Sequence, residues 1–409
     1  MRILILTLNY SPELTGIGKY SGEMAEWLAA RGHEIRVVTA PPYYPMWRVT
    51  EGYKWWSYCR ETLAGTDVWR CPIWVPGSPS GLKRILHLAS FAFTSFPVML
   101  CNAFWRPNIV IVVEPPLFCA PTSLLVSWLC RAYSWLHVQD FEVDAAFELG
   151  LLKSRRMRRI VLWVERMLLA KFDRISSISG HMLARLSTKG VVSEKQVLFP
   201  NWVDVDYIHP LGSLSNFREQ LGISDSGIVF LYSGNMGEKQ GLEIIIESAR
   251  QLVEFENIII VLCGHGSSYG RLRELSSDLG NVIWLPLQPL ERLNDLLNLA
   301  DVHLLPQKAD AADLVMPSKL TGMLASGRPV LATVSEGTQI AEVLKSSGVI
   351  VPPGNIDLLV AAMLELSGNA EQRQLLGENA RSYAVEYFGR DVILTLFEES
   401  LQKCMLTRH

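Results

Sequence analysis

Residues 1–22 read "MRILILTLNYSPELTGIGKYSG" and place an apolar run directly before a loop with three glycines. The run over 3–8 has the length and composition of a buried strand. After the loop, 18–31 is predicted to be an amphipathic helix that stops at Gly32, and "HEIRVVTA" (33–40) a second strand. A strand, a helix and a strand in this order predict a right-handed parallel crossover, which is the repeating unit of a doubly wound α/β sheet.

The same pattern continues along the chain and then begins again. Apolar strand-like segments follow at 107–116, 132–140 and 174–179, and a second series starts with 227–235, 257–266 and 281–287. A length of 409 residues with 49% hydrophobic and 19% charged residues fits two packed domains. The prediction is an α/β protein with two Rossmann-like units, over 1–203 and 204–385, and a helix over 386–409 that returns to the first.

The glycine loop does not fit a dinucleotide-binding fingerprint. Gly16 lies eight residues beyond Leu8, and the second predicted strand ends without an acidic residue that could bind a ribose. Two interpretations stay open. The loop either caps the helix as a simple turn, or presents the backbone N–H groups of Gly16 and Gly18 to an anion.

Charge distribution and cysteine content indicate the kind of partner and the cellular compartment. Residues 1–205 hold 23 basic and 16 acidic residues, whereas the rest hold 15 and 25, so a basic half precedes an acidic one. This asymmetry suggests an anionic partner for the first domain; we expect a membrane surface and no nucleic acid. The seven cysteines form no CxxC pair and predict reduced core thiols in a cytoplasmic protein, and no signal peptide is evident.

Four motifs together resemble the retaining glycosyltransferases of family four. They are the glycine loop, "FPNWVD" (199–204), "YSGNMGEKQGLE" (232–243) and "MPSKLTGMLASGRPVLAT" (316–333). The resemblance covers essentially the whole chain and implies the GT-B fold, in which two Rossmann-like domains face a central cleft. It also implies an acceptor site in the first domain and a nucleotide-sugar donor site in the second.

A nucleoside diphosphate gains negative charge as the glycosidic bond breaks, so the donor site needs preorganised cations. Lys239 follows the first strand of the second domain. Lys319 lies in the first turn of a helix that starts near Ser318, where a cation is unfavourable unless an anion binds there too. Either lysine could instead be an ordinary solvated residue. By resemblance Lys239 contacts the diphosphate, and Asn235 stands where many members have arginine.

The sequence departs from the family at a pair of glutamates. Leu314 and Gly322 occupy the two positions, so ribose contact by the second glutamate is lost. Asp310 or Asp313 could replace the first, although exposed loop carboxylates are an equal alternative. Many relatives also end a first-domain strand with a His-Asp pair, which here reads Gln139-Asp140.

The remaining candidate site residues follow from their positions after strands. Asp140 is the preferred catalytic carboxylate, because His137 reads as a buried strand residue. Gly264 in "CGHG" is expected to line the donor pocket, and Gln288 to contact the base. "DVD" (204–206) imitates a metal-binding motif but lies at the domain joint, so neither a metal nor a cofactor is predicted.

The uncharged run 85–105 is long enough to span a membrane, but Pro97 and its place between two strands favour a buried or interfacial helix pair. Basic clusters at 80–84 and 153–159, with Trp55, Trp56 and Trp105, predict docking on the inner face of the cytoplasmic membrane. A solvated basic face is the plain alternative.

The function expected from all of this is transfer of a hexose from a nucleoside diphosphate sugar, for which GDP-fucose is one candidate, to a lipid-linked oligosaccharide. The product would be an exopolysaccharide of the colanic-acid type or an O-antigen. Two alternatives stay open: a catalytically impaired glycan-binding or assembly subunit, and a nucleotide-sugar epimerase of similar shape. The oligomeric state is not predictable from these residues.

Overall fold

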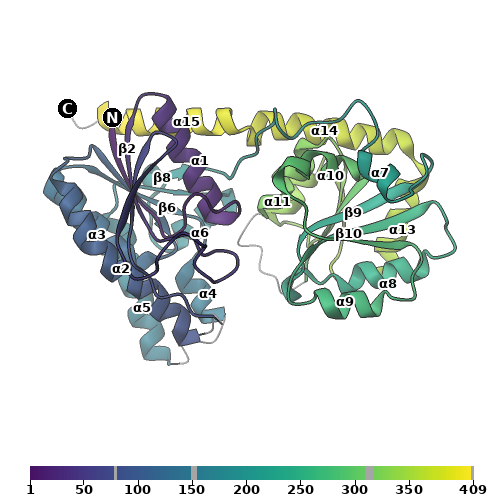
Figure 1. Cartoon of the computed structure of the whole chain (residues 1–409), viewed down its shortest axis with the longest axis horizontal. Coiled ribbons are helices and arrows are strands. Elements are labelled where there is room, and N and C mark those ends of the chain that lie inside the picture. The colour runs from purple at the N-terminus through teal and green to yellow at the C-terminus, as the bar shows by residue number, and fades with distance from the viewer. Residues whose placement is uncertain (78–80, 149–153, 309–316, 407–409) are drawn as a thin grey trace. The chain divides into compact units, whose positions relative to one another are not determined.

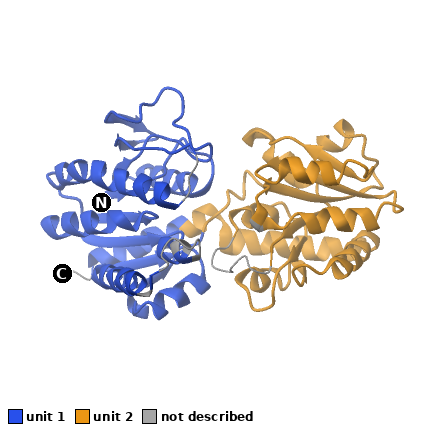
Figure 2. Ribbon diagram, turned by 90° about the horizontal axis from the view of Figure 1, so that it is seen from below, with its two compact units in different colours: residues 1–200, 394–409 blue, residues 201–393 orange. Residues whose placement is uncertain are grey.

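The computed structural model describes residues 1–77, 81–148, 154–308 and 317–406. The chain divides into two compact units (Figure 2), one formed by Met1–Pro200 with Leu394–His409 and the other by Asn201–Ile393. The sequence placed the boundaries after 203 and 385. Each unit contains a parallel sheet with helices on both faces, and the prediction of two doubly wound α/β units is confirmed.

Unit 1 alternates strands and helices from its first residues (Figure 1). Its strands are β1 Arg2–Leu6, β2 Glu34–Thr39, β3 Cys59–Leu63, β4 Thr66–Arg70, β5 Ile109–Glu114, β6 Tyr133–Val138, β7 Arg174–Ser177 and β8 Gln196–Leu198. Its helices are α1 Gly16–Ala30, α2 Gly81–Ala103, α3 Ala120–Cys130, α4 Glu142–Glu148, α5 Arg155–Lys171 and α6 Gly180–Thr188.

The sheet of unit 1 has the order β3-β4-β2-β1-β5-β6-β7-β8, and only β3 runs antiparallel to its neighbour. β1 is central, with Ile5 opposite Val37 of β2 and Ile111 of β5. Four of its five residues are fully buried, because helices cover both faces of the sheet. This explains why the strand is a continuous apolar run rather than an alternating one.

Two features of unit 1 differ from the sequence-based expectation. The hairpin β3-β4 was not predicted, since β3 is mostly exposed and carries no apolar alternation. The uncharged run forms one helix, α2, rather than a pair, with Pro97 inside it. Its buried residues recur every three or four positions, so one stripe packs on the core. Within the described residues, α2 is the one helix long and apolar enough to cross a membrane.

The cysteines also differ in part from the expectation of core thiols. All seven are free, and four are buried, but Cys59 and Cys101 are exposed. Cys59 lies on the edge strand β3, and Cys101 lies on the solvent side of α2. An apolar sequence neighbourhood therefore does not by itself bury a residue on the outer face of an amphipathic helix.

Unit 2 has a second sheet in the order β11-β10-β9-β12-β13-β14, with all pairs parallel. The strands are β9 Ile228–Asn235, β10 Ile258–His265, β11 Val282–Leu285, β12 Val302–Pro306, β13 Val330–Thr333 and β14 Gly348–Val351. The helices are α7 Asn216–Gln220, α8 Glu243–Gln251, α9 Tyr269–Leu275, α10 Leu293–Leu299, α11 Ser318–Ala325, α12 Gln339–Leu344, α13 Ile356–Gly368 and α14 Ala370–Phe388.

The last helix, α15 Arg390–Leu406, begins in unit 2 and continues into unit 1. In unit 1, Phe397 stacks on Phe199 with ring centres 3.9 Å apart and meets Trp135 edge-on. The buried carboxylate of Glu398 accepts hydrogen bonds from Arg31 and His33 at 2.7 and 2.8 Å. The C-terminal segment is therefore held to unit 1 by both aromatic packing and a polar clamp.

Replacing Phe397 by alanine should lower the free energy of unfolding of unit 1 by about 3–5 kcal/mol, as for other buried aromatic truncations. Leu396→Ala is the matched control, because Leu396 is exposed and should change stability by less than about 0.5 kcal/mol. Urea unfolding followed by tryptophan fluorescence measures both. Equal losses in the two variants would show that α15 is not packed as described.

Candidate functional site

The strand order of each sheet singles out one place for a ligand. In doubly wound sheets a ligand binds beyond the carboxyl ends of the strands, where the strand order reverses. In unit 2 this point lies between β9 and β12, and in unit 1 between β1 and β5. Asn235 at the end of β9, and Ser318 and Lys319 in the helix that follows β12, lie at the first of these places, and the glycine loop after β1 lies at the second.

Lys319 carries the clearest electrostatic signal in unit 2. Its ammonium nitrogen is buried and makes no hydrogen bond. It lies over the ring of Tyr232, 4.2 Å from the ring centre, and burial lowers its pKa to about 7. A buried cation without a partner is costly, so this geometry favours an anion close to the nitrogen.

The residues before the last ones of β9 and β10 are both glycines, and one of them lies beside this lysine. Gly234 and Gly264 are partners in register, with φ of +141° and +147°. A Cβ on Gly264 would lie 1.9 Å from the carbonyl oxygen of Gly234, and one on Gly234 would meet the Lys319 side chain at 3.5 Å. Glycine at 264 is thus required by a close approach of two strands.

The other predicted donor residues lie at the same edge of the sheet of unit 2. Asn235 is exposed at the end of β9, and its carbonyl accepts a hydrogen bond from Tyr232 at 2.6 Å. Ser318 is the exposed first residue of α11. Gln288 follows β11 and donates to the carbonyl of Pro286 at 2.9 Å. The sequence did not single out Tyr232, although its position two residues before Gly234 in β9 places it at the edge.

Four residues that the sequence analysis singled out in this domain lie wholly or partly outside the described residues. The backbone of Lys239 lies in the short turn Glu238–Gln240 after β9, but its side chain is outside the described residues. Asp310, Asp313 and Leu314 also lie outside them. Their roles remain predictions.

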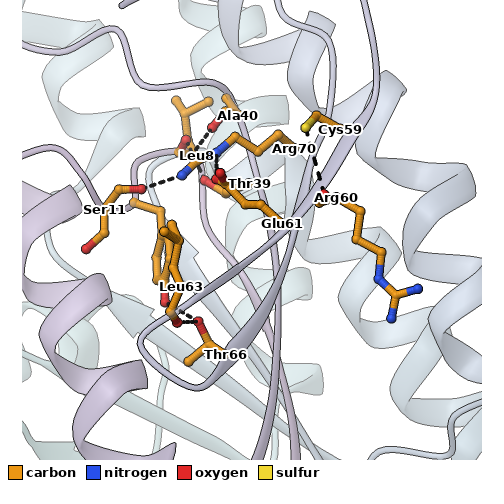
Figure 3. Close-up of polar contacts among 11 residues, drawn as sticks. Leu8, Ser11, Thr39, Ala40, Cys59, Arg60, Glu61, Leu63, Thr66 and Arg70 are labelled. Carbon is orange, nitrogen blue, oxygen red and sulfur yellow. Dashed lines mark hydrogen bonds and ion pairs between the residues drawn. The ribbon is translucent and has the colours of Figure 1, made fainter. Parts of the chain in front are cut away.

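In unit 1, a buried arginine fixes the loops that follow two strands (Figure 3). Arg70, the last residue of β4, donates to the carbonyl oxygens of Ser11 at 2.5 Å and Ala40 at 2.9 Å, and pairs with Glu61. Ser11 belongs to the loop after β1, and Ala40 follows β2. One guanidinium therefore ties three neighbouring strand ends together. This role could not be predicted from local sequence patterns, since the partners are up to 59 residues away.

Glu13 organises the glycine loop from inside. Its buried carboxylate accepts hydrogen bonds from the amides of Tyr43 and Tyr44, each at 2.9 Å, and from the side chain of Asn9. Burial raises its pKa, although these bonds oppose the rise. A Cβ on Gly18 would lie 2.5 Å from this carboxylate, so packing within the loop explains the glycine. Gly16, by contrast, starts α1 with φ +59° and has only Tyr44 nearby, at 3.6 Å.

His137, in strand β6, and Asp140, just after it, differ in burial. His137 is buried, contacting Ser176 through Nδ1 and the amide nitrogen of Gln139 through Nε2, both at 2.9 Å. Since an amide nitrogen can only donate, Nε2 accepts and His137 is neutral, and burial lowers its pKa to about 3. Asp140 follows at the carboxyl end of the strand, half-buried. Within this pair, Asp140 is therefore the better placed for contact with a ligand.

Sequence reasoning missed a pair of buried acids beside this edge. Glu114 ends β5 completely buried, and one of its carboxylate oxygens has no hydrogen-bond partner. Burial, together with the nearby Glu142, raises the pKa of Glu114 well above its ordinary value. Glu142 itself accepts a hydrogen bond from the amide of Leu117 at 2.7 Å. Glu114 is therefore expected to be a neutral acid.

In the "DVD" segment at the domain joint, the first carboxylate takes part in local hydrogen bonds. Asp204 accepts hydrogen bonds from the amides of Asp206 and Tyr207 and pairs with Arg390 at 2.7 Å. In the part of the chain that the structure describes, no three His, Cys, Asp or Glu side chains are grouped as metal ligands.

Comparison with known proteins agrees with this architecture. Residues 15–202 match the family "Glycosyl transferase 4-like domain", and 215–383 match "Glycosyl transferases group 1". The chain is 43% identical over 97% of its length to the Escherichia coli (strain K12) protein named "Putative colanic acid biosynthesis glycosyl transferase WcaI", covering 98% of that protein. This chain belongs to the family-four glycosyltransferases.

Solved structures of such enzymes share the fold of this glycosyltransferase. Sucrose-phosphate synthase from Thermosynechococcus elongatus superposes with a TM-score of 0.75 at 17% identity, with 100% of both chains covered. Anabaena HepE in complex with UDP-glucose gives 0.70 at 15% identity, covering 98% of this chain and 99% of that one. The predicted GT-B fold is confirmed, and the protein is a glycosyltransferase.

Substitutions at Gly16 test the role of the glycine loop. Gly16→Val should lower the free energy of unfolding by about 1–2 kcal/mol, because a left-handed conformation is strained with a Cβ. Gly16→Asn should lose less, since asparagine tolerates this region. If the loop amides contact the donor, Gly16→Val also lowers kcat/KM more than its melting temperature explains. Normal transfer by a normally melting Gly16→Val variant would leave the loop as a helix cap.

Proposed function

We propose that this glycosyltransferase moves a hexose from a nucleoside diphosphate sugar to a lipid-linked oligosaccharide. The transfer retains the anomeric configuration, needs no metal ion and serves synthesis of an exopolysaccharide or O-antigen. GDP-fucose is one candidate donor. Measuring the anomeric configuration of the product by NMR tests the stereochemistry, and a panel of GDP-, UDP- and dTDP-sugars tests the donor.

The observation that carries the donor proposal is the unpartnered ammonium of Lys319 at the switch point of unit 2. A diphosphate there would supply the missing counter-charge, and the cation would stabilise the charge that develops on the leaving group. Ser318 and the start of α11 would add backbone donors, and Lys239 is the proposed second cation. Asp140 of unit 1 is the proposed carboxylate facing the reacting sugar.

An exposed apolar face of unit 1 supports the lipid-linked acceptor. Helix α5 exposes four large apolar side chains at helical spacing: Met157, Ile160, Trp163 and Met167. Its first turns also carry three exposed arginines: Arg156, Arg158 and Arg159. Helix α3 contacts α5, and α2 contacts α3 (Figure 1). These two helices expose further large apolar residues: Phe93, Phe96, Leu125, Trp128 and Leu129. An apolar stripe flanked by cations fits the interface of an anionic membrane, which makes peripheral attachment to the inner face of the cytoplasmic membrane our proposal.

A second candidate function rests on one position in α11. Gly322 stands where the family usually has a glutamate and provides no carboxylate for a ribose; a Cβ at this position would lie 3.5 Å from Leu297. A glycan-binding or assembly subunit with impaired catalysis would tolerate this loss. Donor hydrolysis by the purified protein separates the two functions, since only the enzyme releases nucleoside diphosphate above the uncatalysed rate.

Nucleotide binding should be linked to proton uptake through Lys319. Its pKa of about 7 leaves the free amine mostly neutral at pH 8.5, and a bound diphosphate favours the ammonium. Calorimetry of UDP and GDP binding in buffers of different ionisation enthalpy should show uptake approaching one proton at pH 8.5 and less at pH 6. The affinity should fall by up to about tenfold per pH unit above 7.

The matched variants for this test are Lys319→Met and Lys345→Met. The first should lose the proton uptake and at least tenfold in affinity, whereas the second removes an exposed lysine of the same unit and should change neither. EDTA should leave wild-type binding unchanged. Wild-type affinity in Lys319→Met would place the diphosphate elsewhere.

Membrane attachment is tested by vesicle sedimentation. The double variant Ile160→Ser with Trp163→Ser removes the most exposed apolar residues of α5 and should bind phosphatidylglycerol vesicles at least fivefold more weakly, at an unchanged melting temperature. Leu375→Ser, an equally exposed change on α14, is the control. High salt should also release the wild type. If vesicle binding is unchanged both by the double substitution and by high salt, this surface is not the membrane-binding site.

A further inference from the structure

A cavity of about 680 Å³ lies in unit 1, and its lining residues come from other loops than the glycine loop. Its walls include the aromatic side chains of Trp47, Tyr53, Trp55 and Trp74, together with Arg48. These residues come from the loops after β2 and β4, so the cavity is at the carboxyl edge of the sheet, where ligands of such sheets bind. The volume lies within the range of small-molecule sites.

The aromatic walls are held from below by two buried polar side chains. His87 of α2 is completely buried, contacts the carbonyl of Trp74 at 2.6 Å and the hydroxyl of Tyr43 at 3.0 Å, and packs against the ring of Trp47. Arg70, which clamps the strand ends, also lies under the ring of Tyr53, 4.8 Å from its centre. The walls are therefore preorganised rather than a loose surface loop.

The backbone and the exposure of the same residues point to a ligand. Trp47 adopts φ +51°, a conformation that a bulky residue avoids and that accumulates at binding sites. Trp55 and Trp74 each leave 40% or more of their surface exposed although they border a cavity. Large indole surfaces facing an open cavity are unfavourable in water unless something covers them.

We propose that this aromatic pocket binds a sugar ring of the acceptor glycan. A pyranose has an apolar face of C–H groups, which packs on the electron-rich face of an indole, and a rim of hydroxyls, which suits an open cavity and the guanidinium of Arg48. A hydrocarbon chain would be badly matched by the charge of Arg48. The assignment rests on the proposed function, since it presumes that a glycan is the acceptor.

The pocket also adjoins the loop that the sequence singled out. The amides of Tyr43 and Tyr44 are bonded to Glu13, and Tyr44 is the side chain nearest to Gly16. Trp47 lies only three residues further along the same segment. A sugar held on these indoles would therefore sit beside the glycine loop within unit 1.

The test uses ligand-observed NMR on the full-length protein with a panel of methyl glycosides of glucose, galactose, mannose, fucose and glucuronate. At least one should bind the wild type with a millimolar Kd. Trp55→Ala and Trp74→Ala should each weaken it at least fivefold, whereas Trp55→Phe keeps an aromatic face and should stay within about threefold. Trp56→Ala is the control, because Trp56 is exposed next to Trp55 but does not line the cavity.

Two parallel measurements separate the alternatives. UDP and GDP affinity should be unchanged in Trp55→Ala, and vesicle binding should be unchanged in Trp74→Ala, while the Ile160→Ser, Trp163→Ser double variant should keep glycoside binding. Loss of nucleotide binding in Trp55→Ala, loss of vesicle binding in Trp74→Ala, or equal weakening by Trp56→Ala would overturn the proposal. If nucleotides bind but no glycoside does, the pocket assignment fails while the proposed donor site stands; if glycosides bind but nucleotides do not, the donor site fails instead.

Discussion

A parallel sheet ends all its strands at one edge, and this constraint governs both units. At that edge the last backbone groups lose their ladder partners, and the connecting loops crowd together. The chain must satisfy those groups without filling the space that a ligand needs. In unit 1 the answer is a buried side chain, Arg70, whose guanidinium binds carbonyl oxygens from two loops at once.

Unit 2 meets the same constraint by omitting side chains. Gly234 and Gly264 let the ends of β9 and β10 approach closely, and the Lys319 side chain lies beside Gly234. The lysine rests on the face of Tyr232, whose ring partly compensates an ammonium removed from water. An aromatic ring offers less than a carboxylate would, so the charge remains available to an incoming anion. A salt bridge between Lys319 and a carboxylate would have stabilised the free protein and lowered its affinity for a diphosphate.

How far the sequence predicts the molecule follows from the range of the interactions involved. The alternation of β1, α1 and β2 depends on local periodicity and was predicted within a few residues. The hairpin β3-β4 was missed because exposed, charged strands leave no apolar pattern. Lys319 could be singled out from a charge misplaced at a helix start. Its burial over Tyr232 could not, since the two residues are 87 positions apart and meet only through the order of the strands.

The glycine loop also shows what sequence patterns cannot predict. The spacing of its glycines suggested a phosphate contact, whereas the structure places the carboxylate of Glu13 against Gly18. A glycine that lets a ligand approach and one that lets a neighbouring side chain approach look identical in sequence. Only the fold shows that the Glu13 side chain lies against Gly18, and that a Cβ on Gly16 would meet the Tyr44 ring at 3.6 Å.

The outer strand β3 has a consequence for how the protein behaves at high concentration. An edge strand presents unpaired backbone groups that can recruit a strand from another molecule. Here the edge is short, runs antiparallel to the rest of the sheet, and carries Arg60, which is bonded through two nitrogens to Asp67. Charged side chains at such an edge disfavour a second strand, because pairing would strip them of water. The hairpin that sequence periodicity does not reveal thus protects the β3 edge of this sheet against intermolecular strand addition.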